Sequence, residues 1–344
     1  MIPQKKILFI SEASEKIGFG HFSRSIELYK EFLISRDFNI YFLIAIDKKK
    51  LVHFLKSRGL TFSDHFLCFD SWNYQRIIES LNKTFFSCVV FDLQSEHSEL
   101  RSYFSNSKSK TLSLDFFFQQ NYSDVIVNLF NHKLSHECTE TYSKTKILSG
   151  PKYSIIRDKF KSIRHERSLQ QIDRPIQNIL IAMGGSDPNN LTMKIIHRIQ
   201  KLRFINQIKE ISIVIGPLFS ESQKNKINRL AMSVNSLKVF IEPENFESFF
   251  LNNDLIFCGG GTTLLESMSC GMPAIVIPQS QEELNHATSY AKKNACIVYD
   301  KAENIAENFF DISLLNKIKN NALNTVDHYG KNRILEIVTD LINE

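Results

Sequence analysis

The chain has 344 residues, about twice the usual size of one domain, so two domains are expected. Hydrophobic residues make up 43% and charged residues 23%, which is ordinary for a globular protein and excludes disordered, collagen-like and coiled-coil chains. The net charge of +5 comes from 42 basic and 37 acidic residues scattered along the chain. This small surplus does not predict a nucleic-acid partner, and it is compatible with a small anionic molecule or with weak attraction to an anionic membrane surface.

The sequence predicts no membrane insertion, because its apolar stretches fall far short of the roughly 20 residues that span a bilayer. The opening MIPQKKILFI enters an apolar run without a small-residue cleavage site, so we expect a first strand and not a signal peptide. The six cysteines have no paired spacing, which favours a reducing, cytoplasmic setting. His132, His136 and Cys138 have no second cluster to complete four zinc ligands, so we expect neither a metal site nor a cofactor.

The first half of the chain alternates strand-like and helix-like segments. Apolar residues recur every three or four positions from His21 to Leu33, which predicts a helix with one buried face. Nearly continuous apolar runs predict strands buried on both faces, as in a parallel sheet covered by helices. These runs are residues 5–14, 40–46, 66–69, 88–91, 111–117 and 125–130.

A charged segment, Asp158–Pro175, separates the two halves, and we expect a linker at residues 161–175 within it. The second half then repeats the alternation. Its expected strands are residues 178–182, 211–215, 238–241, 254–258, 274–277 and 296–299, and its expected helices are 189–202, 220–233, 262–269, 282–294 and most of the remainder. We therefore predict an α/β fold of two doubly wound, Rossmann-like domains, residues 1–160 and 176–344, facing a central cleft.

Glycine is scarce, with 12 among 344 residues, yet seven of the twelve fall in three clusters. Each cluster follows a strand-like run and precedes a helical pattern, an arrangement that offers free N–H groups to phosphate or hydroxyl groups. The clusters are Gly18 with Gly20, Gly184 with Gly185, and Gly259 to Gly261.

The first cluster leads into His21 and Arg24, and Ser23 stands where a dinucleotide fingerprint has its third glycine. His21 at a helix start suits a general base, and an ordinary helix-start residue is the alternative. The second cluster continues through Ser186 into a helix that begins near Pro188. Here the alternative to an anion loop is a turn that needs glycine for its backbone alone.

In the third cluster, Thr262 and Thr263 follow the glycines at a helix start, where their hydroxyls can reach phosphate oxygens. Glu266 lies one turn further on and shares their face, so it can accept hydrogen bonds from a ribose diol. The spacing from Thr263 to Glu266 also fits a plain capping box, although capping alone does not require three glycines.

Together these motifs resemble known families. The segment GGGTTLLESMSCGMPAIVIPQSQEELNHA resembles the nucleotide-sugar loop of GT-B-fold enzymes, including the lipid-II-forming N-acetylglucosaminyltransferases. The segments KIGFGHFSRSIEL, GPKYSIIRDKF and GGSDPNNLT narrow the resemblance to the UDP-sugar hydrolases of the pseudaminic acid pathway. Those enzymes release a 2,4-diacetamido-2,4,6-trideoxy sugar from UDP. The resemblance runs from about residue 5 to about residue 300.

The resemblance implies that residues 1–160 form the sugar- or acceptor-side domain and residues 176–344 the nucleotide-binding domain. It makes His21 the base that activates water and Glu266 the residue that holds the ribose. The other residues that it implicates in substrate binding are Gly18, Gly20, Arg24, Asp92, Gly184, Gly185, Ser186, Gly260, Gly261, Thr262, Thr263 and Gln281. The chain departs from the family on the sugar side, where Gln94 stands in place of a tyrosine.

The leading functional hypothesis is hydrolysis of a UDP-linked diacetamido-trideoxy sugar at the anomeric carbon, releasing UDP and the free sugar for nonulosonic acid synthesis. The alternative is a GT-B glycosyltransferase that uses a UDP-sugar donor and a sugar or lipid acceptor, since one histidine can deprotonate either water or a hydroxyl. A third interpretation is a nucleotide-binding or scaffold protein without catalysis. The run Lys48-Lys49-Lys50-Leu51 hints at peripheral membrane contact, and a solvated loop is its commoner explanation.

Overall fold

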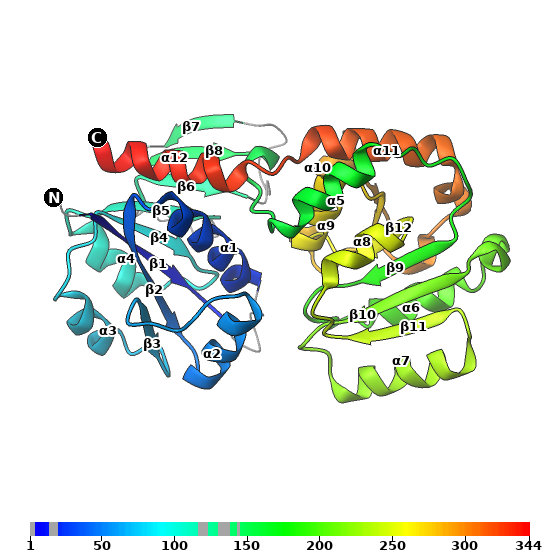
Figure 1. Cartoon of the computed structure of the whole chain (residues 1–344), viewed down its shortest axis with the longest axis horizontal. Helices are drawn as coiled ribbons and strands as arrows, with labels where there is room; N and C mark the ends of the chain where they lie inside the picture. The colour runs from blue at the N-terminus through cyan, green and yellow to red at the C-terminus, as the bar shows by residue number, and fades with distance from the viewer. Residues whose placement is uncertain (1–3, 14–19, 116–122, 130–137, 143–144) are drawn as a thin grey trace. The chain divides into compact units, whose positions relative to one another are not determined.

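The computed structural model describes residues 4–13, 20–115, 123–129, 138–142 and 145–344, and the chain divides into two compact units (Figure 1). Unit 1 comprises residues 1–155 and 329–344, and unit 2 comprises residues 156–328. Each unit has a largely parallel sheet with helices packed on it, which confirms the predicted α/β class with two doubly wound domains.

Unit 1 contains an eight-stranded sheet in the order β3-β2-β1-β4-β5-β6-β8-β7. Its strands are β1 (Lys5–Ser11), β2 (Phe38–Ala45), β3 (Phe66–Phe69), β4 (Cys88–Asp92), β5 (Lys110–Leu114), β6 (Val125–Asn128), β7 (Cys138–Tyr142) and β8 (Thr145–Ser149). Its helices are α1 (Gly20–Ser35), α2 (Lys48–Ser57), α3 (Tyr74–Leu81), α4 (Ser98–Ser105) and α12 (Gly330–Asn343). The pair β7–β8 is antiparallel and was not expected from the sequence.

Strand β1 shows why the apolar runs are continuous. Ile7 and Phe9 point into a core formed with α1, α2 and α12, whereas Leu8 and Ile10 point into a second core formed with α3 and α4. Successive side chains of a strand face opposite sides of the sheet, so a strand covered on both sides needs apolar residues at every position.

Unit 2 contains a six-stranded sheet in the order β11-β10-β9-β12-β13-β14. Its strands are β9 (Asn178–Ala182), β10 (Glu210–Ile215), β11 (Leu237–Ile241), β12 (Leu255–Cys258), β13 (Ala274–Val276) and β14 (Ile297–Val298). Its helices are α5 (Lys159–Ser168), α6 (Leu191–Ile199), α7 (Glu221–Ser233), α8 (Phe249–Asn252), α9 (Thr262–Cys270), α10 (Gln281–Ala291) and α11 (Ile312–Thr325).

The two sheets share one topological feature. In each, the unit's first strand lies inside the sheet, and the strand order reverses between β1 and β4 in unit 1 and between β9 and β12 in unit 2. The strands on either side of each reversal end together, because Ser11 pairs with Asp92 and Ala182 pairs with Cys258. Ligands of open α/β sheets bind beyond the carboxyl ends of the strands at this point. The topology therefore directs attention to the loops after these four strands.

The expected linker at residues 161–175 is corrected by the structure, since α5 occupies its first part and belongs to unit 2. Phe160 and Ile163 of α5 are buried. The guanidinium of Arg164 donates to the carbonyls of Ser269, Leu323 and Val326, at the last turns of α9 and α11, over 2.6–2.9 Å. The final carbonyls of a helix lack partners within the helix, so a cation from α5 stabilises them. Arg164 is therefore a charged residue of this segment that caps other helices.

The predicted C-terminal domain, residues 176–344, also ends too late. Residues 329–344, which contain α12, belong to unit 1. Ile334, Val338 and Leu341 of α12 join the core beneath α1. The side chain of Asn332 donates to Glu31 of α1 over 2.6 Å. A chain of the predicted N-terminal domain alone would leave this apolar surface of unit 1 uncovered.

None of the described helices is long and apolar enough to cross a membrane. The lysine run at 48–50 is not a loop, since it forms the first turn of α2 and Asp47 accepts the backbone N–H of Lys50 over 3.0 Å.

The assignment of α12 to unit 1 predicts where a mutation acts. Ile334→Ala creates a cavity in the core of unit 1 and should lower its unfolding free energy by about 2–5 kcal/mol. Trp72 is the single tryptophan of the chain and lies in unit 1, so denaturant unfolding followed by its fluorescence reports on that unit. The control is Ile318→Ala in α11 of unit 2, which should not change the denaturant midpoint of the Trp72 transition. Equal shifts from both variants would contradict the assignment.

Candidate functional site

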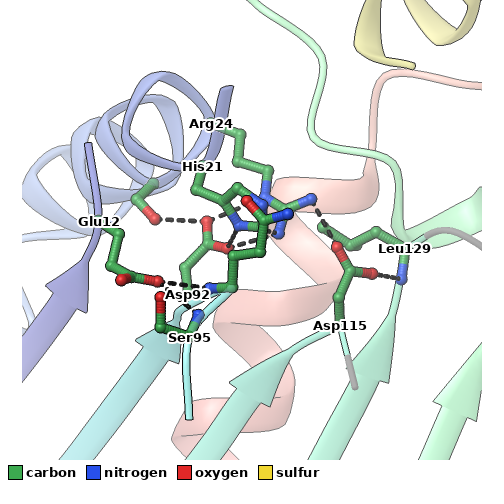
Figure 2. Close-up of polar contacts among 9 residues, drawn as sticks. Glu12, His21, Arg24, Asp92, Ser95, Asp115 and Leu129 are labelled. Carbon is green, nitrogen blue, oxygen red and sulfur yellow. Dashed lines mark hydrogen bonds and ion pairs between the residues drawn. The ribbon is translucent and has the colours of Figure 1, made fainter. Parts of the chain in front are cut away.

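A histidine–aspartate pair lies at the reversal point of unit 1 (Figure 2). His21 is the second residue of α1, and Asp92 is the last residue of β4. Their Nδ1 and Oδ1 atoms are 2.7 Å apart, and the histidine side chain is 15% exposed whereas the aspartate is 1% exposed. Nη2 of Arg24 also lies 3.0 Å from Nδ1 of His21. When Nδ1–H donates to the carboxylate of Asp92, Nε2 of a neutral imidazole carries the lone pair. The pair is therefore built as a base held by a buried anion.

Arg24, one turn after His21, forms ion pairs with two buried carboxylates (Figure 2). Its Nε donates to Asp92 Oδ2 over 2.9 Å, and its Nη1 lies 2.6 Å from Asp115 Oδ2. Ser25 also donates to Asp92 Oδ2 over 2.7 Å, and the N–H of Leu129 donates to Asp115 Oδ1 over 2.8 Å. Asp92 therefore accepts hydrogen bonds from α1, whereas Asp115 is held by a hydrogen bond at Oδ1 and an ion pair at Oδ2.

The electrostatics of this group favour an ionised Asp92. Burial alone would raise the pKa of Asp92, but the charges and hydrogen bonds of Arg24 and His21 lower it well below its usual range. Burial would lower the pKa of Arg24, and the charges of Asp115 and Asp92 raise it instead. One guanidinium faces two carboxylates, so one negative charge is left to stabilise a proton arriving on His21.

A second carboxylate, Glu12, fixes the turn that follows Asp92. It lies just beyond β1, is 3% exposed, and its Oε2 accepts the backbone N–H groups of Gln94 and Ser95 over 2.6 and 2.8 Å. Its Oε1 lies 2.7 Å from Nε2 of His97. Burial would raise the pKa of Glu12, but the hydrogen bonds from His97 and Ser95 lower it from 4.5 to about 2.

The ring of His97 contacts Tyr74 and Trp72 as well as Glu12. The backbone of His97 has a φ of 45°, a left-handed conformation that costs energy outside glycine. Its Nδ1 lies 3.1 Å from the hydroxyl of Tyr74, and its ring centroid lies 4.2 Å from that of Trp72. Sequence reasoning missed Glu12 and His97, because residues 85 positions apart carry no local pattern.

The loop after β9 uses its own carboxylate to cap the next helix. Asp187 is 2% exposed, and its two oxygens accept the N–H groups of Leu191 and Thr192 over 2.8 Å each, at the start of α6. Gly184 adopts a φ of +95°, and the side-chain amide of Gln279 donates to the carbonyl of Ser186 over 3.0 Å. Asp187 therefore takes up N–H groups in the first turn of α6. The anion contacts that were predicted for this loop can come only from the backbone of residues 184–186.

The loop after β12 leaves its helix start open. Gly261 is the N-cap of α9 and makes no side-chain cap, so the capping box expected as an alternative at Thr263 is not formed. Within the described chain, the N–H groups of Gly261, Thr262 and Thr263 have no acceptor. A helix of nine residues with uncapped N–H groups favours an anion there.

The N–H of Gly260, by contrast, is already bonded. It donates to Oε2 of Glu283 over 3.0 Å, and the N–H of Gln279 donates to the same oxygen over 2.8 Å. A Cβ on Gly260 would lie 2.4 Å from the carbonyl oxygen of Glu283, so this glycine is required by the packing of α10. His286, fully buried, holds the carbonyl of Gly260 at 2.5 Å from its Nδ1. Gly260 therefore shapes the loop, and of the predicted phosphate-binding residues here only Gly261, Thr262 and Thr263 have N–H groups without an acceptor in the described chain.

The remaining predicted residues are placed as follows. Glu266 is 4% exposed and accepts a hydrogen bond from Nε of Arg157 over 2.6 Å. Gln281 is the exposed first residue of α10 and donates to Asn285 over 3.0 Å. Gly20 begins α1, and among the described residues no atom lies within 4 Å of a Cβ built on it. Gly18, His132 and His136 lie outside the described residues.

Comparisons with known proteins support the fold. Residues 178–333 match the glycosyltransferase family 28 C-terminal domain. MurG of Acinetobacter baumannii superposes with a TM-score of 0.64 at 14% identity, covering 98% of this chain and 99% of that one. The chain has the GT-B fold.

Two relatives align over most of the chain. An uncharacterized protein of Methanocaldococcus jannaschii is 26% identical over an alignment of 351 positions that covers 98% of this chain and 67% of that protein. The UDP-2,4-diacetamido-2,4,6-trideoxy-beta-L-altropyranose hydrolase of Campylobacter jejuni is 22% identical over 86% of this chain and 99% of that enzyme.

The low pKa of Glu12 predicts a pH effect on stability. Its folded pKa of about 2 lies below its ordinary 4.5, so the ionised group stabilises unit 1 above pH 4.5 and this stabilisation is lost as pH falls toward 2. Glu12→Gln removes the titration, so between pH 5 and 2 the variant should lose roughly 3 kcal/mol less unfolding free energy than the wild type.

The measurement is denaturant unfolding across that pH range, followed by Trp72 fluorescence. Glu79→Gln, an exposed acid on α3, is the matched control and should keep the wild-type pH dependence. If Glu12→Gln and the wild type lose equal stability on acidification, Glu12 does not clamp the turn after β4.

Proposed function

We propose that this protein hydrolyses a UDP-linked diacetamido-trideoxy sugar at its anomeric carbon. The observation that carries the proposal is the His21–Asp92 pair at the reversal point of unit 1, in which a buried carboxylate holds the ring of the histidine. The family 28 match over residues 178–333 and the alignment with the Campylobacter jejuni hydrolase support a UDP-sugar as the substrate.

In the proposed reaction, unit 2 holds the nucleotide and unit 1 supplies the base. Nε2 of His21 takes a proton from water as the water oxygen bonds to the anomeric carbon. The bond from that carbon to the β-phosphate oxygen breaks, and UDP leaves with the electron pair. Asp92 stabilises the imidazolium that forms, as a carboxylate does for any histidine base. The N–H groups of residues 261–263 at the start of α9 meet the charge of the diphosphate.

A glycosyltransferase of the same fold is the second candidate, favoured by the family 28 match. Its chemistry differs only in the group that His21 deprotonates, a hydroxyl in place of water. Incubation with UDP-amino sugars, with and without sugar or lipid acceptors, separates the two when the products are followed by NMR. Free sugar without an acceptor supports the hydrolase, and turnover that requires an acceptor supports the transferase.

The role of His21 gives a direct prediction. His21→Ala should lower kcat by about 10²–10⁴-fold, the usual contribution of a general base. UDP affinity should stay close to that of the wild type, because the base acts on the sugar carbon and not on the nucleotide. UDP release and UDP binding are measured on one preparation, and His53→Ala, an exposed histidine on α2, serves as the control.

Two outcomes would contradict the proposal. Wild-type turnover in His21→Ala would remove His21 as the base. An equal fall in kcat and in UDP affinity would assign His21 to nucleotide binding and reverse the roles of the two units. Asp92→Asn preserves the side-chain shape but removes the acceptor charge, so its kcat should fall in the same direction.

A further inference from the structure

The segment GPKYSIIRDKF, residues 150–160, carries part of the sequence resemblance, and it contains Arg157, which donates to Glu266. The chain crosses from unit 1 to unit 2 within it, between Ile155 and Ile156. Arg157 is the second residue of unit 2 after this crossing. Its side chain reaches a residue more than 100 positions away, Glu266 in α9.

The contact between Arg157 and Glu266 is closely held. The Nε of Arg157 lies 2.6 Å from Oε1 of Glu266, with the two side chains 18% and 6% exposed. The rings of Phe160 and Phe246 have their centroids 5.0 and 5.5 Å from the guanidinium carbon. Two aromatic faces restrict a planar guanidinium far more than they restrict a flexible ammonium. The direction from which Glu266 receives its hydrogen bond is therefore set by α5 and the short 3-10 helix Phe246–Ser248.

The carboxylate of Glu266 is left with one oxygen available. Oε1 accepts from Arg157, while Oε2 accepts no hydrogen bond from the described part of the chain. Glu266 lies one turn after Thr262 and Thr263, whose N–H groups also lack acceptors there. An open carboxylate oxygen one turn from open N–H groups suits a ligand that carries hydroxyl donors close to an anionic group, as a nucleoside diphosphate does.

We propose that Arg157 is a positioning residue for nucleotide binding, orienting Glu266 so that Oε2 accepts hydrogen bonds from the vicinal diol of the ribose. The inference rests on the proposed function, because it takes the ligand of unit 2 to be a nucleoside diphosphate. Without Arg157, the Glu266 side chain regains rotational freedom, and its carboxylate no longer presents one fixed oxygen to the diol. The cost of that loss falls on the diol and leaves the diphosphate contacts unaffected.

The test compares two ligands on several variants. UDP and 2′,3′-dideoxy-UDP differ only by the diol, so their ratio of affinities, measured by calorimetry, isolates that contact. The wild type should bind UDP about tenfold or more tightly than the dideoxy form, as expected for hydrogen bonds to a charged group. In Arg157→Gln the ratio should fall to about twofold, while binding of the dideoxy ligand changes little.

Two further variants make the result specific. Arg164→Gln removes helix-capping bonds at the far end of α9 and should keep the wild-type ratio, although it lowers thermal stability. Arg157→Lys keeps the charge and folds with less disturbance, but it cannot reproduce the stacked Nε donor, so its ratio should fall between those of the wild type and Arg157→Gln.

The outcomes separate this inference from the function on which it rests. If Arg157→Gln and Arg157→Lys discriminate the two ligands as the wild type does, Arg157 does not position Glu266. If the wild type binds both ligands equally, Glu266 holds no diol and the inference fails while UDP binding stands. If the wild type binds neither ligand, the proposed function itself is wrong.

Discussion

The carboxylate of Asp92, buried at the end of β4, determines how the carboxyl edge of unit 1 is arranged. A buried anion without partners costs several kcal/mol, so its surroundings must supply donors. Helix α1 supplies these donors from the side chains of three residues: His21, Arg24 and Ser25. Arg24 is itself buried and requires a second carboxylate, Asp115, whose backbone φ of 59° shows that β5 ends in a strained turn to provide it. The position of the candidate base thus follows from charge compensation between α1, β4 and β5.

Unit 2 repeats the topology of unit 1 but uses its carboxylates differently. Asp187 caps α6, and the carboxylate of Glu283 accepts the N–H groups of Gly260 and Gln279. In both places a carboxylate of the chain itself takes up backbone donors. Each of these acids occupies a position where a phosphate would otherwise find backbone donors. The start of α9 is the exception, since no side chain caps it. These acids of the chain therefore restrict where an anionic ligand can bind. The positions of the glycines in the sequence do not by themselves show which loop remains open.

The sequence predicted what depends on local pattern and missed what depends on long-range contact. Most strands, the glycine loops and the His21 helix follow from periodicity and composition, and β12 and α9 begin within one residue of prediction. Helix α5 was hidden because Arg164 and Arg167 bind helix carbonyls, so its buried face contains charged residues and lacks an apolar stripe. Asp92 was found through the resemblance, but its partner Asp115 was assigned no role. Glu12 and His97, and the return of α12 to unit 1, involve partners too distant in sequence to leave a signal.

The clustered glycines can now be divided by the physical reason for each. Gly184 has a positive φ, and a Cβ on Gly259 or Gly260 would meet Glu283, so conformation or packing within the chain accounts for these three. Gly20 and Gly185 adopt ordinary φ values, and a Cβ on either would meet nothing within 4 Å. Gly261 is similar, with an ordinary contact of 3.6 Å to Glu283. Neither backbone strain nor crowding within the described chain requires glycine at these last three positions. They lie after β1, β9 and β12, at the reversal points of both sheets, where a bare backbone allows the closest approach of a ligand. In a chain that uses so little glycine, we propose that these positions are kept as glycine for a bound molecule.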